Sequence, residues 1–235
     1  MRLDIHLTKF YNMQSRNKAS ELIKNKKIEI DGKIVTKSSF QVEDNHTIKI
    51  LQDKFFVSRS AYKLKYFLED NNINVSDKEA LDIGSSTGGF TQVLLESNVK
   101  EVTAVDVGKD QLHSKIKNDS RVYSFESCDI RKFKSAKKFD LVVSDVSFIS
   151  LLYILDDVQR LATKDIILLF KPQFEVGREA KRDNHGVVLD ETVILNAMNK
   201  FENACEEKGW KLIQKSPSKL TGKEGNLEYC YYFEK

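Results

Sequence analysis

ALDIGSSTGGF, residues 80–90, is the stretch of this sequence that most clearly indicates its fold. An apolar strand is expected to end at Asp82, and residues 84–89 then turn the chain into a helix that begins near Phe90. Glycines in such a turn let backbone amides approach a ligand, and the helix N-terminus favours a polar or anionic group. Ligands of open α/β sheets bind at the carboxyl ends of the strands. The loop therefore predicts a ligand site as well as a fold class.

Around this loop, strands alternate with helices from about residue 58 onward, and this pattern predicts a parallel sheet. We expect strands at residues 79–83, 101–105, 121–125, 140–144, 165–170, 211–215 and 229–233, the last two forming an antiparallel pair. The clearest helices are expected at residues 90–97, 151–161 and 192–208. The predicted fold class is α/β, with a doubly wound, Rossmann-like domain built on a seven-stranded sheet.

Two cofactors compete for the glycine loop. A dinucleotide fingerprint requires G-x-G-x-x-G, whereas this loop reads G-S-S-T-G-G. An S-adenosylmethionine site accepts a looser glycine loop and needs an acid after the second strand, where Asp106 stands; an acid near that spacing also serves NAD. A tight turn without a ligand is the plain structural alternative. The loop spelling favours S-adenosylmethionine, with expected contacts from Asp82, Gly84, Ser85, Ser86, Thr87, Gly88, Gly89, Phe90, Asp106 and, for the adenine, Asp129.

The first quarter of the chain carries all of its excess positive charge. Of 38 Lys and Arg and 35 Asp and Glu, residues 1–58 hold eleven and seven, a net charge of +4, which leaves −1 for residues 59–235. Helical spacing of apolar residues predicts two short helices, at residues 3–11 and 15–23. The alternation around Asp31-Gly32 predicts a hairpin, followed by a strand at 47–51. We expect two domains, residues 1–57 and 58–235, joined by a short link at about residues 52–56.

Several classes of protein are excluded by what the sequence lacks. Its three cysteines, at positions 128, 205 and 230, do not have zinc-ligand spacing, and with four histidines they give no reason to expect a metal. The N-terminal residues lack the apolar run of a signal peptide, and the most apolar stretch, 141–155, is too short to span a bilayer. We expect a soluble, cytoplasmic protein that does not bind membranes.

Two charged residues directly follow apolar strands of the expected sheet. Asp145 follows the fourth strand and Lys171 follows the fifth, so both side chains are expected at the ligand-bearing edge. A lysine beside a buried run is costly without a partner. Lys63, expected just before the first helix of this domain, and Glu228, expected at the start of the last strand, complete a set of four candidates.

The N-terminal segment SRNKASELIKNKKIEIDGKIVTKSS resembles the small α-L RNA-binding domain of the ribosomal protein S-four type. A run of charge alone is usually a solvated surface, but this resemblance implies a structured RNA as the partner. The residues implicated in RNA binding are Arg2, Arg16, Lys18, Lys24, Lys26 and, at the start of the second domain, Arg59.

The chain as a whole resembles the TlyA family, also called hemolysin A. These are rRNA 2′-O-methyltransferases with an N-terminal RNA-binding module and an FtsJ-like, class I S-adenosylmethionine-dependent catalytic domain. The matching motifs are RLD, SRNKA, VSRSAYKL, LDIGSSTGGFT, DVGKDQL, SDVSFISL, KPQFE, HGVV and GNLEY. The resemblance implies a catalytic K-D-K-E tetrad at Lys63, Asp145, Lys171 and Glu228. It implies a cytidine of ribosomal RNA as target, in the large subunit for a chain this short, with the small subunit left open.

The sequence departs from the family pattern at two places. Ser60-Ala61 stands where two glycines are expected before the first lysine of the tetrad, and Asp129 stands where many relatives carry Asn. The residues alone leave open whether Lys171 takes the proton of the 2′-hydroxyl or stabilises the alkoxide. Three other functions are weighed against methyl transfer: membrane lysis, which lacks a spanning or basic amphipathic segment, a non-catalytic RNA-binding or assembly role, and NAD(P)-dependent oxidoreduction, which the loop spelling disfavours.

Overall fold

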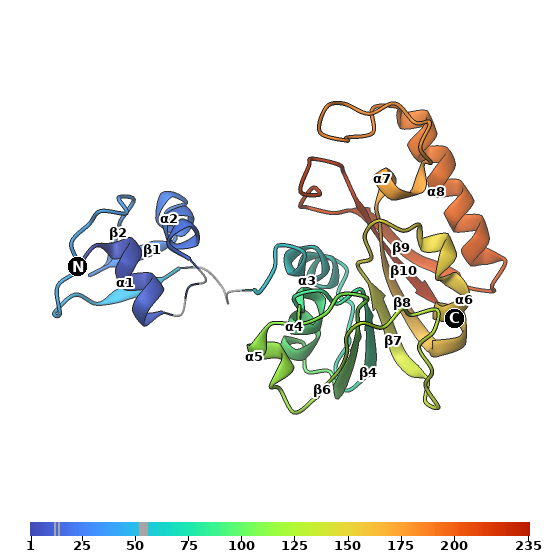
Figure 1. The fold of residues 1–235 in the computed structure, drawn as a ribbon, viewed down its shortest axis with the longest axis horizontal. Helices are drawn as coiled ribbons and strands as arrows, with labels where there is room; N and C mark the ends of the chain where they lie inside the picture. Colours follow the sequence, from blue (N-terminus) through green and yellow to red (C-terminus); the bar gives the residue numbers. More distant parts are fainter. Residues whose placement is uncertain (12, 14, 52–55) are drawn as a thin grey trace. The chain divides into compact units, whose positions relative to one another are not determined.

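The computed structural model describes residues 1–11, 13, 15–51 and 56–235, which form two compact units, Met1–Phe55 and Phe56–Lys235 (Figure 1). Most of the expected link, residues 52–55, lies outside the described residues. None of the helices in the described ranges is long and apolar enough to cross a membrane.

The N-terminal unit combines two helices with a small antiparallel sheet. Ser15 caps the second helix, its hydroxyl accepting from the Lys18 amide at 3.2 Å. The expected hairpin forms at Asp31-Gly32, where both residues have positive φ, as the favoured two-residue turn requires. The elements are α1 (Leu3–Phe10), α2 (Arg16–Lys24), β1 (Ile28–Ile30), β2 (Lys33–Ile34) and β3 (Ile48–Ile50), with sheet order β2-β1-β3.

The second unit is built on a seven-stranded sheet with the order β6-β5-β4-β7-β8-β10-β9. Five of its strands run parallel, and β10 pairs antiparallel with both β8 and β9. The predicted α/β class, the seven strands and the late antiparallel pair are confirmed. The strands are β4 (Glu79–Ile83), β5 (Glu101–Val105), β6 (Val122–Phe125), β7 (Phe139–Ser144), β8 (Ala162–Phe170), β9 (Lys211–Pro217) and β10 (Tyr229–Glu234).

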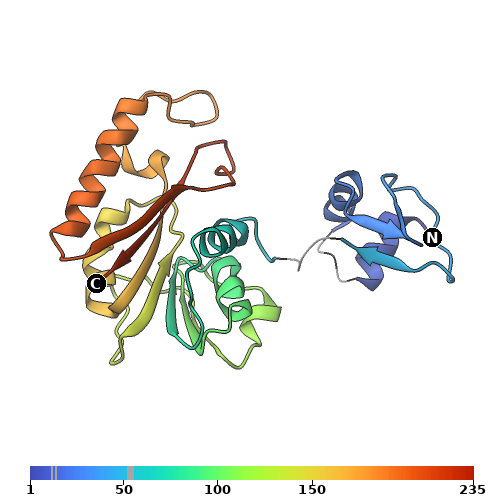
Figure 2. The same ribbon diagram turned by 180° about the vertical axis from the view of Figure 1, so that it is seen from behind.

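Helices cover both faces of this sheet, as the two opposite views show (Figures 1 and 2). On one face, apolar residues of α3 (Ala61–Asp70), α4 (Gly89–Glu96) and α5 (Ser114–Lys117) pack against the strands in one buried cluster. On the other, η1 (Leu151–Tyr153), α6 (Leu155–Leu161) and α8 (Glu191–Glu206) form a second cluster. A short helix, α7 (Pro172–Glu175), follows β8 directly. The core thus lies in two layers, and the strand ends remain available for a site.

The structure corrects two expectations about helices. Lys63 lies inside the first helix of this unit rather than before it, because Ser60 already has helical backbone angles and α3 begins at Ala61. The single helix expected at residues 151–161 is divided into η1 and α6 at Ile154, whose buried side chain packs in the core between them. The short helices α5 and α7 were not predicted, since four residues are too few to show a helical period.

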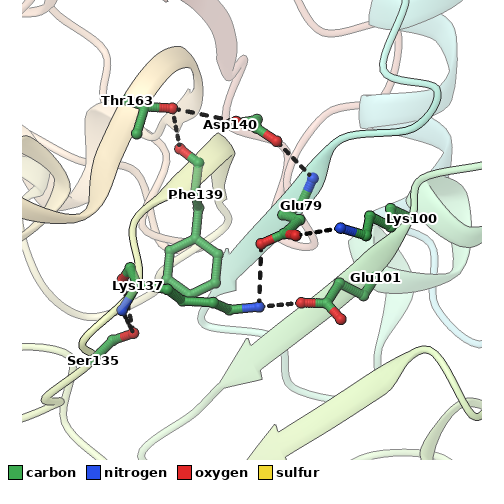
Figure 3. Close-up of polar contacts among 8 residues, drawn as sticks. All are labelled: Glu79, Lys100, Glu101, Ser135, Lys137, Phe139, Asp140 and Thr163. Atoms are coloured by element: carbon green, nitrogen blue, oxygen red, sulfur yellow. Dashed lines mark hydrogen bonds and ion pairs between the residues drawn. The ribbon is translucent and has the colours of Figure 1, made fainter.

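The strand ends opposite the glycine loop are joined by charged side chains (Figure 3). Lys137 contacts the carboxylates of both Glu79 and Glu101, at the starts of β4 and β5, and Lys100 also donates to Glu79, at 2.6 Å. Asp140 of β7 accepts from the Glu79 amide at 3.1 Å. Ion pairs therefore link the strands at this end of the sheet, and the opposite end, which carries the glycine loop, remains available for ligands.

Candidate active site

The loop after β4 turns sharply against the loop after β7. Gly84 has φ +78°, and a Cβ added there would lie 3.1 Å from the Val146 side chain and 3.2 Å from its Cα. Only glycine combines this left-handed conformation with such a close approach. The turn continues through Gly88, also at positive φ, into α4. The backbone amides of residues 84–88 are thereby held at the carboxyl end of the sheet.

Asp106 follows β5 and organises the neighbouring loop. Its Oδ2 accepts from the Ser86 amide at 2.7 Å and its Oδ1 from the Gly108 amide at 2.6 Å. These bonds tie the loop after β5 to the glycine loop after β4. The carboxylate stays 8% exposed, and its remaining lone pairs are available to hydroxyl groups of a ligand.

Glu126 holds the other end of the loop after β5. Its Oε1 accepts from the amides of Gln111 and Leu112 at 2.7 and 3.1 Å, and its Oε2 accepts from Lys117 at 2.8 Å. The bond from Lys117, followed by those from the amides, lowers the pKa of Glu126 to about 2. The loop is thus fixed by a carboxylate that is ionised throughout the physiological range.

A cavity of about 540 Å³ opens between these loops. Of the residues predicted to bind the cofactor, Gly84, Ser86, Asp106 and Asp129 line it, together with apolar residues such as Val107 and Ile130. The other six residues do not line the cavity; they lie in the turn or in the core and determine the shape of the loop. They are Asp82, Ser85, Thr87, Gly88, Gly89 and Phe90.

Asp82 is fully buried near this cavity. Its Oδ2 accepts from the Thr91 hydroxyl at 2.6 Å, whereas Oδ1 has no hydrogen-bond partner among the described residues. Burial raises the pKa of Asp82 to about 7, against the opposing bond from Thr91. A buried carboxylate oxygen without a donor is costly, and a ligand cation placed beside it would remove that cost.

Asp129, which was expected to contact the adenine, forms an ion pair with Arg131 in this structure. Both of its carboxylate oxygens accept from the Arg131 guanidinium, at 2.6–3.1 Å, and Oδ1 also accepts from the Arg131 amide. These bonds, the side-chain bond first, lower the pKa of Asp129 to about 2. Asp129 lines the cavity as one half of an ion pair, so any adenine contact must use its remaining lone pairs.

The four tetrad candidates all line a second cavity, of about 780 Å³. They form two ion pairs. Lys63 Nζ lies 2.5 Å from Glu228 Oε2, and Lys171 Nζ lies 2.7 Å from Asp145 Oδ1. Lys63, Lys171 and Glu228 are buried, so each charge depends on its partner rather than on water. The structure therefore brings together four residues that the sequence separates by up to 165 positions.

The two cavities meet at the loop after β7. Asp145, Ser147 and Phe148 line both of them. Ser147 Oγ accepts from Lys171 Nζ at 2.8 Å, which places this ammonium at the junction. A group held in the first cavity can therefore reach a group held in the second beside Lys171.

Phe148 is a site residue that the sequence analysis missed as a candidate. Its side chain is 91% exposed, its φ is +66°, and its ring lies 5.3 Å from the ring of Phe174. A bulky residue in the left-handed region is strained and persists only where its surroundings impose it. Glu175 of α7 supports this segment by accepting from the Ser150 hydroxyl at 2.6 Å and the Leu151 amide at 2.8 Å. An exposed aromatic face at this position suits stacking on a flat ring.

The outer wall of the second cavity consists of two loops joined by Asn226. Its Oδ1 accepts from the Val188 amide at 3.0 Å, and its Nδ2 donates to the Gly186 carbonyl at 3.2 Å. Arg182 in the first loop donates to four backbone carbonyls, including that of Gln173 at 3.3 Å. The wall is therefore held by hydrogen bonds to the backbone. The motifs HGVV and GNLEY contain part of it, but no role was predicted for Asn226 or Arg182.

Two of the predicted RNA-binding residues share one carboxylate. Arg2 donates to both oxygens of Asp4 at 3.1 Å, and Arg16 donates to Oδ2 at 2.9 Å. The bond from Arg2 does most to hold the pKa of Asp4 well below its usual range. The Asp4 side chain is 4% exposed, whereas those of Arg2 and Arg16 are 45% and 58% exposed. Both guanidiniums therefore keep donors that face solvent.

The other predicted RNA-binding residues differ in their contacts. Lys18 forms an i,i+3 ion pair within α2. Lys24 and Lys26 are exposed and form no ion pair with another residue in the described ranges. Arg59 is exposed at the rim of the second cavity, 3.4 Å from the backbone carbonyl of Thr221.

No group of three or more His, Cys, Asp or Glu side chains in the described residues is placed to hold a metal ion. The junction of the two cavities contains the two lysine–carboxylate pairs, with backbone amides and one exposed aromatic ring beside them.

Comparison with known proteins gives the family. Residues 56–235 match the FtsJ-like methyltransferase family, and residues 1–48 match the S4 domain. The chain is 46% identical to the 23S rRNA (cytidine-2′-O)-methyltransferase TlyA of Campylobacter jejuni, with 100% of both proteins covered. It is 37% identical to the 16S/23S rRNA (cytidine-2′-O)-methyltransferase TlyA of Mycobacterium tuberculosis, covering 97% of this chain and 87% of that one.

A solved structure from Streptococcus thermophilus, described as a hemolysin, is also similar. It has a TM-score of 0.74 at 30% identity and covers 100% of this chain and 88% of the other. These matches confirm the resemblance inferred from the motifs, including the S4-type module and the methyltransferase fold. The chain therefore belongs to the TlyA family of FtsJ-like methyltransferases that carry an N-terminal S4 domain.

Proposed function

We propose that this enzyme transfers the methyl group of S-adenosylmethionine to the 2′-hydroxyl of a cytidine in ribosomal RNA. The observation that carries the proposal is the meeting of two cavities at Asp145, Ser147 and Phe148, with Lys171 at the junction. One cavity has the size and lining of a nucleoside site, and the other contains the paired lysines and carboxylates. An enzyme with such a substrate works in the cytoplasm, where ribosomal subunits are assembled.

The first cavity fits S-adenosylmethionine in the chemistry of its donors and acceptors. Asp106, after β5, has lone pairs for the ribose hydroxyls. Asp82 does not line the wall itself, and we propose that its buried, unpartnered Oδ1 becomes the partner of the ammonium of the methionine part when the ligand enters. Apolar side chains and the edge of the Asp129–Arg131 ion pair remain for the adenine. When bound, the cofactor supplies a methyl group on a sulfonium, which is already activated for transfer.

The remaining task of the protein is to align the ribose oxygen and to manage its charge. Alignment alone can supply several kcal/mol of the roughly 8–23 kcal/mol by which enzymes lower barriers. Lys171 Nζ pairs with Asp145 Oδ1 and donates to Ser147 Oγ, and its third contact, to the Asp145 carbonyl, is long at 3.5 Å. The third donor of this ammonium can turn to the substrate oxygen and stabilise the negative charge that develops there, while the hydroxyl proton passes to solvent water.

Lys63 and Glu228 form the second charged pair of the same cavity. Because Glu228 neutralises Lys63 and Asp145 neutralises Lys171, the two buried pairs themselves add no net charge to the substrate pocket. We propose that this pair orients the ribose, while Lys171 contacts the reacting oxygen.

The substrate proposed is RNA because the outer cavity combines cations with an aromatic face. Arg59 and Lys223 line it, and Phe148 exposes its ring at the junction. Cations suit phosphate groups, and an exposed ring suits an unstacked base. The S4 domain adds a second RNA-binding surface with a net charge of +4 across residues 1–58. Cytidine is proposed from the names of the two TlyA relatives.

Methyl transfer from labelled S-adenosylmethionine to purified ribosomal subunits tests the proposal. The expected product is 2′-O-methylcytidine, at one defined position in each subunit that is modified. Digestion to nucleosides and mass spectrometry separate this product from a base-methylated one, which would contradict the proposed acceptor. Assaying the small and large subunits separately shows which of them is the substrate.

A further inference from the structure

Glu228 is bound by a second residue besides Lys63. Its Oε2 accepts from Lys63 Nζ at 2.5 Å, and its Oε1 accepts from Gln173 Nε2 at 3.1 Å. The carboxylate is 2% exposed, so water does not replace a missing donor. In the described residues no other group donates to Oε1. The orientation of Glu228 therefore depends on two donors, and one of them is an uncharged amide.

The backbone of Gly222 closes another side of this carboxylate. A Cβ added at residue 222 would lie 2.6 Å from Glu228 Oε1. No larger residue fits there without moving the carboxylate, so a side-chain donor cannot approach from that side. Gln173 approaches from α7 instead.

Gln173 also connects the two ion pairs of the tetrad. It is two positions after Lys171, and the buried Pro172 between them fixes the backbone at the start of α7. Lys171 reaches Asp145 from this turn, and Gln173 reaches Glu228. A displacement of α7 would therefore change both pairs together.

The orientation of the Gln173 amide leaves its oxygen without a hydrogen bond, which costs free energy and is not explained by packing. Its Oε1 is buried and has no hydrogen-bond partner among the described residues. Rotating the amide would satisfy neither end, because the oxygen would then face the carboxylate oxygen of Glu228. Unpaired buried polar atoms in native proteins are uncommon, and they gather where function requires one orientation.

We propose that Gln173 is a positioning residue for methyl transfer: its amide holds the Glu228 carboxylate toward Lys63 and couples that pair to the Lys171–Asp145 pair. This inference rests on the proposed function. It assigns Gln173 no contact with the substrate or with the cofactor, and its effect passes through Glu228.

The first test removes the donor while keeping the shape. Gln173→Met is expected to lower kcat about tenfold, the effect of removing one hydrogen bond to a charged group, with little change in KM for RNA. Affinity for S-adenosylmethionine, measured by calorimetry, and the melting temperature should stay close to wild type. A variant impaired only in packing would instead show lower stability or weaker cofactor affinity.

The second test uses pH. Gln173→Glu places a carboxyl group against Glu228, and the like charge raises the pKa of the introduced group. Its protonated form can donate as the amide does. The ratio of variant to wild-type kcat should therefore rise as the pH falls and decline as the pH increases. The other charged or titratable groups around this site are the same in both proteins: Arg59, Lys63, Asp145, Lys171, Arg182, His185, Lys223, Glu224 and Cys230.

Gln214→Glu, on the edge strand β9 and outside both cavities, is the matched control for the change of charge. Its ratio to wild type should not vary with pH. Wild-type kcat in both Gln173 variants, or a ratio independent of pH in Gln173→Glu, would overturn the inference while leaving methyl transfer established. A wild-type chain that forms no 2′-O-methylated rRNA would overturn the proposed function and this inference with it.

Discussion

Lys63 and Glu228 are 165 positions apart in the sequence, and their side chains form a buried ion pair with an Nζ–Oε2 distance of 2.5 Å. The pair joins α3, the first helix of the catalytic unit, to the start of β10, its last strand. The parallel pair of Lys171 with Asp145 joins the ends of the adjacent strands β7 and β8. Folding of the catalytic unit therefore brings the four charged residues of the site together.

Lys171→Ala should abolish methyl transfer and leave cofactor binding within about twofold of wild type, because Lys171 does not line the cofactor cavity. Lys171→Arg should also be inactive, since the planar guanidinium cannot replace the ammonium between Asp145 and Ser147. Turnover with labelled cofactor and calorimetry check both expectations. Lys200→Ala, on the exposed surface of α8, serves as the control. Turnover by Lys171→Ala close to that of this control would refute the role of Lys171.

Phe148→Ala should lower kcat/KM for RNA by about tenfold, an amount equivalent to removing one stacked base from an aromatic ring. The melting temperature should not fall, because the side chain is 91% exposed and its backbone is strained. Tyr153→Ala is a suitable control, since Tyr153 is 70% exposed but lines neither cavity. Equal kinetic effects of the two substitutions would show that Phe148 has no special part in binding RNA.

Affinity for S-adenosylmethionine should weaken as the pH falls below about 7. Burial raises the pKa of Asp82 to about 7, so below that pH the carboxyl is protonated and cannot pair with the ligand ammonium. The decrease should approach about tenfold per pH unit, the limit for one coupled proton. Calorimetry between about pH 5.5 and about 7.5 measures it. Asp82→Asn should bind weakly with little dependence on pH, and a wild-type slope in this variant would assign the dependence to another group.

The raised pKa of Asp82 also affects the stability of the protein without cofactor. The folded-state pKa of Asp82 lies above its ordinary value of 3.8, so folding favours the protonated form. The stabilisation of wild type relative to Asp82→Asn should therefore decline as the pH rises from about 4 to about 7 and then level off. Urea unfolding at several pH values measures the difference. A relative stability that increases with pH would contradict the assigned shift.

Lys78→Ala should destabilise the catalytic unit by about 3 kcal/mol, because it leaves a buried carboxylate without its cation. Lys78 Nζ lies 2.6 Å from Asp165, whose side chain is 2% exposed. Lys100→Ala removes a pair of the same length at the same edge of the sheet, but Lys100 is 63% exposed. That control should cost less than about 1 kcal/mol. Denaturant unfolding compares the two, and equal destabilisation would show that burial of Asp165 does not determine the cost.

Exchanging Lys24 and Lys26 for Gln should weaken RNA binding and reduce its dependence on salt. For every phosphate that is no longer neutralised, the slope of log K against log salt should fall by about 0.7–0.9. Filter binding of an rRNA fragment over a range of salt concentrations measures the slope. Lys208→Gln, in the catalytic unit and already paired with Asp156, controls for the change in net charge. An unchanged slope in the double variant would remove these lysines from the RNA-binding surface.

Local sequence was sufficient to predict the sheet and part of the site. Asp145 and Lys171 follow strongly apolar strands, and adjacent parallel strands end at one edge, so their proximity follows from topology. The glycine loop could be located for a similar reason, because its spacing and its following helix lie within a few residues. These features depend on neighbours in the sequence or in the sheet.

The remaining features depend on contacts that no local pattern contains. The burial of Lys63 requires Glu228 as a partner, and a buried lysine has no signature of its own in the sequence. The positive φ of Phe148 has no local sequence signal, because bulky residues rarely adopt it. Gln173 is recognisable only from the distance to Glu228. The S4 resemblance suggested Arg2 and Arg16 for RNA, but only the structure shows that Asp4 binds both.

The most direct test of the central claim maps methyl groups on ribosomal RNA after reaction with labelled S-adenosylmethionine. Purified subunits are incubated with the wild-type protein or with Lys171→Ala, and the modified nucleotides are located by nuclease digestion and mass spectrometry. The predicted result is 2′-O-methylcytidine at a defined position with the wild type and none with the variant. Methylation of a base, or equal labelling by both proteins, would contradict the account.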